Sequence, residues 1–106
     1  MGLTNPAVGG VWVHVFEEDG AAGAVFRPEH GDVPLSRRPR ERFELRPDGT
    51  ASWFTGGADD RFVERNGRWA EEGGRIVIRV GGDVRLTICE WSPDRVVAQF
   101  GGRGRE

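Results

Sequence analysis

Hydrophobic and polar residues along the chain fall into short runs of the kind that β-strands produce. The runs alternate or stay apolar over a few residues, and glycine, proline and aspartate separate them. No stretch carries the 3.6-residue spacing of a long amphipathic helix. The pattern therefore predicts β-strands at 11–17, 24–27, 42–46, 51–55, 61–69, 75–80, 84–91 and 95–100.

The alternation is clearest in the last third of the chain. Ile76, Ile78 and Val80 share one face of a predicted strand, and Arg75 and Arg79 lie on the other. A strand with one buried and one solvated face is typical of antiparallel sheets. The connecting sequences "RPDGT" and "SPDR" contain residues that favour tight turns, so consecutive strands are expected to form hairpins.

Eight short strands joined by tight turns hide their edges most economically by closing into a cylinder. We therefore predict an all-β fold, a small antiparallel up-and-down eight-stranded β-barrel. A β-sandwich is the alternative, since the number of strands does not separate the two. An eight-stranded barrel has an interior that side chains fill or that holds one small ligand.

Composition narrows the choice of partners and compartment. A chain of 106 residues is expected to form a single domain with flexible ends at 1–8 and 101–106. Its net charge of −2 argues against nucleic acid as a partner. One cysteine, Cys89, excludes an internal disulfide. With no signal-like segment and no apolar stretch of membrane-spanning length, we expect a cytoplasmic protein that binds no membrane, and a homodimer is compatible with the sequence.

The triplet Gly10-Val11-Trp12 on the first predicted strand resembles the G-x-W signature of the lipocalin and calycin barrels, and Gly67-Arg68-Trp69 repeats the pattern. The nearest resemblance is to small bacterial lipocalin-like proteins. In those families the tryptophan closes one end of the barrel and an arginine near the last strand packs over it. The resemblance implies a lipocalin-like barrel in which Trp12 closes one end and Arg95 covers it.

A histidine interrupts the first apolar run. If Trp12 points inward, the period of a strand places His14 and Phe16 on the same inner face, with Glu18 near the rim. An imidazole there could serve as a general acid or base, or recognise a polar group of a ligand. The alternative is a core histidine that pairs with a carbonyl or a carboxylate. Val11, Val13 and Val15 are apolar too, so the opposite phase stays open.

Acidic and arginine-rich segments flank the second predicted strand. Glu17, Glu18 and Asp19 are typical of a solvated loop, but they could also pair with arginines from the long arginine-rich segment 27–43. Such pairs would place polar groups at the open end, or mouth, of a barrel whose interior is apolar. An arginine at this mouth could bind a ligand carboxylate through two hydrogen bonds, with phosphate as the other candidate guest. The arginines in question are Arg27, Arg37, Arg38, Arg40 and Arg42.

Other chemistry has weaker support. His14, His30, Glu18 and Asp59 or Asp60 are suitable metal donors, but their spacing matches no ligand motif, so no metal and no cofactor is expected. Cys89 lies on a predicted strand and is interpreted as a packing residue. The aromatic residues could pack a core or line a cavity. The candidate ligand-binding residues are Trp12, Phe16, Arg27, Arg37, Arg40, Phe43, Trp53 and Trp69, and the candidate catalytic residues are His14 and Glu18.

Two classes of function follow from this pattern. The first is binding of a small hydrophobic or aromatic molecule that carries a carboxylate or other polar group, inside the barrel. The alternative is a small barrel enzyme of the cyclase, isomerase or lyase type, with His14 as general acid or base. A third interpretation is a barrel with a filled interior whose surface mediates self-association.

Overall fold

A computed structural model of the chain describes residues 8–31, 33–35, 40–56 and 62–101. The terminal segments predicted to be flexible lie almost wholly outside this range. No helix in the described part is long and apolar enough to cross a membrane. The elements are β1 (Val11–His14), the 3₁₀ helix η1 (Phe16–Glu18), β2 (Ala24–Pro28), β3 (Arg42–Leu45), β4 (Thr50–Gly56), β5 (Phe62–Glu72), β6 (Arg75–Val80), β7 (Asp83–Ser92) and β8 (Arg95–Phe100).

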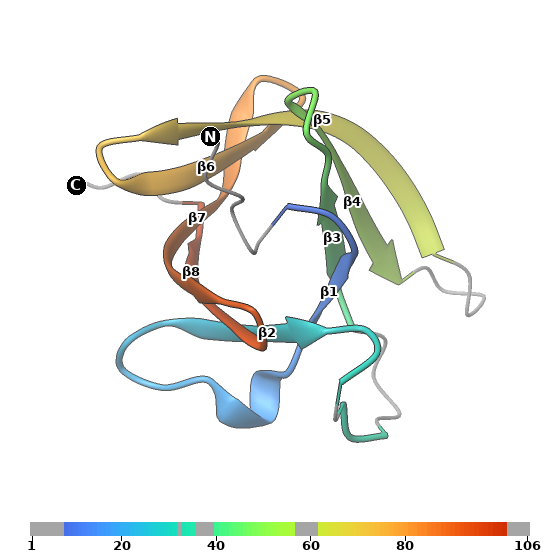
Figure 1. Ribbon diagram of the computed structural model, residues 1–106. Coiled ribbons are helices and arrows are strands. Elements are labelled where there is room, and N and C mark those ends of the chain that lie inside the picture. The colour runs from blue at the N-terminus through green and yellow to red at the C-terminus, as the bar shows by residue number, and fades with distance from the viewer. Residues whose placement is uncertain (1–7, 32, 36–39, 57–61, 102–106) are drawn as a thin grey trace.

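The strands close into one antiparallel barrel, in the order β1-β2-β8-β7-β6-β5-β4-β3 with β3 pairing back to β1. Figure 1 shows the ring that they form around a single interior. The predicted all-β, eight-stranded up-and-down barrel is confirmed, and the alternative of a β-sandwich is wrong. This architecture is consistent with a lipocalin-like fold.

Consecutive strands are neighbours in the barrel at every step except from β2 to β3, which lie on either side of β1. Because β1 pairs antiparallel with both β2 and β3, β2 ends at one end of the barrel and β3 begins at the other. The first residues after β2 reach the start of β1, where Glu29 N–H donates to the Val11 carbonyl at 2.8 Å. Val13 and Val15 are buried although Trp12 faces inward. Both phases of this segment are therefore buried, as its apolar residues on both faces require.

The first strand is shorter than predicted, ending at His14 rather than at residue 17. Beyond it the chain turns through η1, where Glu18 N–H donates to the Val15 carbonyl at 2.9 Å. The Asp19 carboxylate accepts the Val25 N–H at 2.9 Å, which ties the turn to the start of β2. The acidic run therefore ends the strand by offering the backbone a local alternative to sheet pairing.

Large side chains fill the interior. Trp12 stacks on Phe43, with 6.4 Å between ring centroids, and Phe43 stacks on Trp53 at 6.0 Å. Phe26 meets Phe43 edge to face at 5.0 Å. Aliphatic residues from β6, β7 and β8 complete this cluster, among them Ile76, Ile78, Leu86, Ile88 and Val96. The described interior side chains thus pack against one another as a core, as protein interiors generally do.

The glycines of the two G-x-W triplets have different physical roles. Gly10 adopts φ +83°, a left-handed conformation that other residues rarely take, where the chain enters β1. Gly67 lies in the middle of the long β5, where a Cβ atom would be 2.2 Å from the Arg79 carbonyl oxygen. Only glycine allows β5 to approach β6 this closely, so the second triplet reflects backbone packing.

Two β-bulges in β7 change which side chains face the core. The register between β6 and β7 shifts after the pair Ile78 and Leu86, which leaves Arg85 as an extra residue. The register between β7 and β8 shifts again at Cys89, so that Trp91 pairs with Val96 and packs against the core. A bulge redirects side chains that strict alternation would place on the opposite face.

Candidate functional site

The two ends of the barrel differ in chemistry. At the end that we call the His14 end, β1, β4, β6 and β8 finish and the other four strands begin. Here His14 contacts Phe16 directly, and Phe26 and Phe100 link His14 to Trp53 through further ring contacts. The predicted residues Phe43 and Arg40 join this set, Phe43 by stacking on Trp53 and Arg40 by covering Phe16. Trp69, near the end of β5, lies toward the opposite end.

His14 packs among aromatic rings. Its imidazole stacks on Phe26, with 4.9 Å between centroids, and meets Phe100 at 5.3 Å and Phe16 at 6.0 Å in edge-to-face geometry. The side chain is 13% exposed. His14 therefore lies on the inner face, as predicted from Trp12, at a position near the surface of the His14 end.

A carboxylate that the sequence interpretation did not assign to His14 orients its ring. His14 Nε2 lies 3.0 Å and 3.1 Å from the two carboxylate oxygens of Asp19. The same Asp19 carboxylate accepts the Val25 N–H, so its own position is fixed. Glu18, the predicted companion of His14, is instead paired with Arg27. A carboxylate on one ring nitrogen sets the tautomer and leaves the other nitrogen available.

Phe26, Phe43, Trp53 and Phe100 form an aromatic cluster beside His14. Phe100 contacts His14, Phe26 and Trp53, yet it is 45% exposed. Trp53 is fully buried, and its indole N–H has no hydrogen-bond partner within the described part of the chain. Buried donors are nearly always paired, so this one requires an explanation.

Arg40, a predicted ligand-binding residue, serves the barrel itself. Its guanidinium is 5% exposed and donates to both Glu17 carboxylate oxygens, at 2.8 Å and 2.6 Å. It also donates to the carbonyls of His14 and Pro34, each at 2.9 Å, and it covers the Phe16 ring at 4.6 Å. The predicted pairing of a loop arginine with the acidic run is confirmed here, and it joins the β2–β3 connection to the end of β1.

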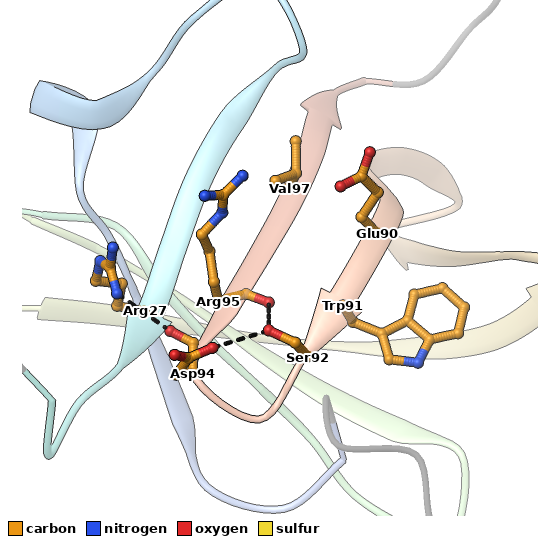
Figure 2. A pocket seen from close by; sticks show the side chains of 7 residues that line it. All are labelled: Arg27, Glu90, Trp91, Ser92, Asp94, Arg95 and Val97. Atoms are coloured by element: carbon orange, nitrogen blue, oxygen red, sulfur yellow. Dashed lines mark hydrogen bonds between the residues drawn. The ribbon is translucent and has the colours of Figure 1, made fainter.

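Arg27 lies on the outer surface. Its Nε is 3.0 Å from a Glu18 carboxylate oxygen, which confirms the second predicted arginine–glutamate pair. Arg27 borders an open hollow of about 290 Å³ between β2, β7 and β8, with Arg95, Trp91 and Asp94 among its lining residues (Figure 2). Arg95 is exposed on the outward face of β8, so the structure does not place it over Trp12 as the resemblance implied.

The remaining predicted residues have structural contacts or fall outside the described range. The Trp69 indole N–H donates to the Arg46 carbonyl at 2.7 Å. Trp12 and Phe43 belong to the packed core. Arg37, Asp59 and Asp60 lie outside the described residues. Among the described residues, no three histidine, cysteine or acidic side chains gather as metal ligands would.

A second feature of the His14 end was not predicted from the sequence. Arg65, Arg85 and Asp83 line a hollow of about 180 Å³ together with Val80 and Val84. The Arg85 guanidinium lies over the Trp53 ring, 5.4 Å from its centroid. This hollow therefore adjoins the aromatic cluster that contains Phe100 and His14.

Comparison with known proteins found no family model, no curated protein and no solved structure that matches this chain. Phe26 and Phe100 could have been assigned to the inner face from strand alternation. The position of Arg85 has no such signal, because it depends on a bulge.

We predict that Arg40→Met lowers the free energy of unfolding by about 2–4 kcal/mol, because Glu17 and two backbone carbonyls lose a buried donor. Urea unfolding followed by tryptophan fluorescence measures the change. Arg79→Met is the matched control. Arg79 also pairs with a glutamate, Glu72, and lowers the pKa of its carboxyl, but that pair is exposed to solvent. A loss for Arg40→Met no larger than that for the control contradicts the assigned role.

Proposed function

We propose that the protein binds a small apolar or aromatic molecule at the His14 end of the barrel. The ligand's ring or chain packs against Phe100 and the neighbouring aromatic side chains. His14 and the arginines of the adjacent hollow face its polar part. Ligand sites commonly combine an apolar surface with a few polar groups in this way.

The observation that carries the proposal is the half-exposed ring of Phe100. It belongs to the inward-facing row of β8, opposite Leu86, and contacts three other rings, so it is held in place by the core. Nearly half of its surface nonetheless faces solvent. An ordered aromatic surface open to water at the mouth of a barrel favours a ligand that covers it.

This proposal places the ligand nearer the surface than the sequence interpretation did. Trp12, Phe43 and Trp53 occupy the interior that a ligand inside the barrel would need. Arg27 and Arg40, the described arginines expected to hold its polar group, are paired with Glu18 and Glu17. The polar partners must therefore come from other residues at the His14 end.

A relationship to the lipocalin-like barrels is part of the proposal. It is supported by the closed eight-stranded barrel and by the burial of Trp12 directly after the positive-φ Gly10. It also fits a ligand that enters at one end of the barrel.

Acid–base catalysis is a second candidate function, favoured by the pairing of His14 with Asp19. In this arrangement the carboxylate would orient the imidazole and stabilise its protonated form, as in other His–Asp pairs. If a bound compound is converted, Asp19→Asn is expected to lower kcat at least tenfold and to shift its pH profile. Turnover that is unchanged in His14→Gln would remove His14 from the mechanism.

We predict that Phe100→Ala weakens binding of 2-naphthylmethanol at least tenfold, because the ligand loses its main aromatic contact. Phe100→Leu, which keeps the apolar volume, is expected to retain part of the affinity. Isothermal titration calorimetry measures the dissociation constants, and circular dichroism checks that the variants fold.

Leu35→Ala is the control for this experiment, since Leu35 is fully exposed and belongs to no part of the aromatic cluster. Equal affinity of the wild-type protein, Leu35→Ala and Phe100→Ala would show that the probe binds elsewhere and would contradict the proposal.

A further inference from the structure

We infer that Arg65 and Arg85 form a carboxylate-binding pair that selects acids among the apolar ligands of the His14 end. The inference rests on the proposed function, and it names the chemical class of ligand. Both arginines lie outside the arginine-rich segment 27–43.

The bulge in β7 directs Arg85 toward the mouth of the barrel. Arg85 is the unpaired extra residue before Leu86, and its guanidinium lies over the ring of Trp53. The backbone is held there because Gly101 N–H donates to the Arg85 carbonyl at 2.9 Å. A guanidinium that stacks on a buried ring is positioned before any ligand arrives, so it loses little freedom on binding.

Arg65 approaches the same place from the other side. It lies directly opposite Trp53 in the pairing of β4 with β5, and it belongs to the same row of β5 as Gly67 and Trp69. Directly paired residues share a face of the sheet, so Arg65 is on the inward-facing row near the end of the barrel. The hollow of about 180 Å³ is bordered by both guanidinium-bearing side chains.

The charges of this hollow favour a single negative charge. Within the described residues, neither Arg65 nor Arg85 has an ion pair, whereas Arg27, Arg40 and Arg79 each pair with a glutamate. Asp83 is the acidic residue in the lining of the hollow. Two guanidiniums and one carboxylate leave one positive charge, which a monoanionic carboxylate neutralises and a phosphate dianion would exceed.

The hydrogen-bond donors near the hollow favour an anionic ligand. The Trp53 ring lies beneath the Arg85 guanidinium, and its indole N–H is a buried donor without an acceptor within the described part of the chain. A carboxylate offers several acceptor sites to such donors. The valines of the hollow supply apolar contact beside the charge. The ring of Phe100 meets the Trp53 ring, on which the Arg85 guanidinium lies.

The test compares three probes that share one ring system: 2-naphthoate, 2-naphthylmethanol and 2-naphthylmethylammonium. We expect 2-naphthoate to bind at least tenfold more tightly than the alcohol, and the ammonium compound to bind most weakly. The preference for the acid should fall at least fivefold in Arg85→Met and in Arg65→Met, and Arg85→Lys should retain part of it. The Trp53 indole N–H resonance, assigned with Trp53→Phe, should shift on addition of 2-naphthoate.

Arg68→Met is the matched control, because Arg68 is an exposed arginine on the opposite face of the same strand. It should keep the full preference for the acid. Equal affinities for the acid and the alcohol would overturn the carboxylate-binding pair while leaving the proposed function intact. A preference for the acid that survives both Arg65→Met and Arg85→Met would overturn the assignment of these residues. Absence of binding by all three probes would contradict the proposed function itself.

Discussion

The pairing of β1 on both of its sides is the constraint on which the rest of this structure depends. β1 spans only Val11–His14, yet it joins β2 to β3 and so turns an open sheet into a closed barrel. Without it two strand edges would be exposed, and the inner row of aromatic side chains would lose one wall. Because a strand this short provides few backbone hydrogen bonds, its position needs support from side chains and from the connection between β2 and β3. Arg40 provides that support by binding the carbonyl of His14 and the carboxylate of Glu17 together.

The same constraint determines where chemistry can occur. Trp12 and His14 lie on the same inner face of β1, with Trp12 in the core and His14 near the surface of the His14 end. The turn after β1 brings the Asp19 carboxylate back to the His14 imidazole. The described arginines among those expected to hold a ligand, Arg27 and Arg40, instead pair with Glu18 and Glu17 of the acidic run. In the proposed site, polar recognition falls to side chains on the opposite wall of the barrel. There the long β5 and the bulge in β7 bring Arg65 and Arg85 beside the aromatic cluster.

The sequence predicted the fold well because the barrel is built from local signals. Alternation and turn residues placed strands at 75–80 and 95–100 with the observed bounds, and closure followed from the need to hide strand edges. The first strand was predicted too long because Val15 and Phe16 continue its apolar run, although they form part of a turn. The site was harder to predict. The inward position of Arg85 depends on a register shift between two strands, and the pairing of His14 with Asp19 depends on a turn. Neither feature can be recognised from the alternation of hydrophobic and polar residues in the sequence.

A closed barrel requires that the segment containing β1 is held from both sides. His14 N–H donates to the Glu41 carbonyl on the β3 side at 2.9 Å, and Val15 N–H donates to the Val25 carbonyl on the β2 side at 2.8 Å. Hydrogen exchange of these two amides, followed by NMR, tests the closure most directly. The account predicts that both exchange as slowly as the hydrogen-bonded core amides of β6 and β7, since either bond opens only when the barrel does. Fast exchange at His14 beside slow exchange at Val15 would mean that β1 leaves β3, and would contradict a closed barrel.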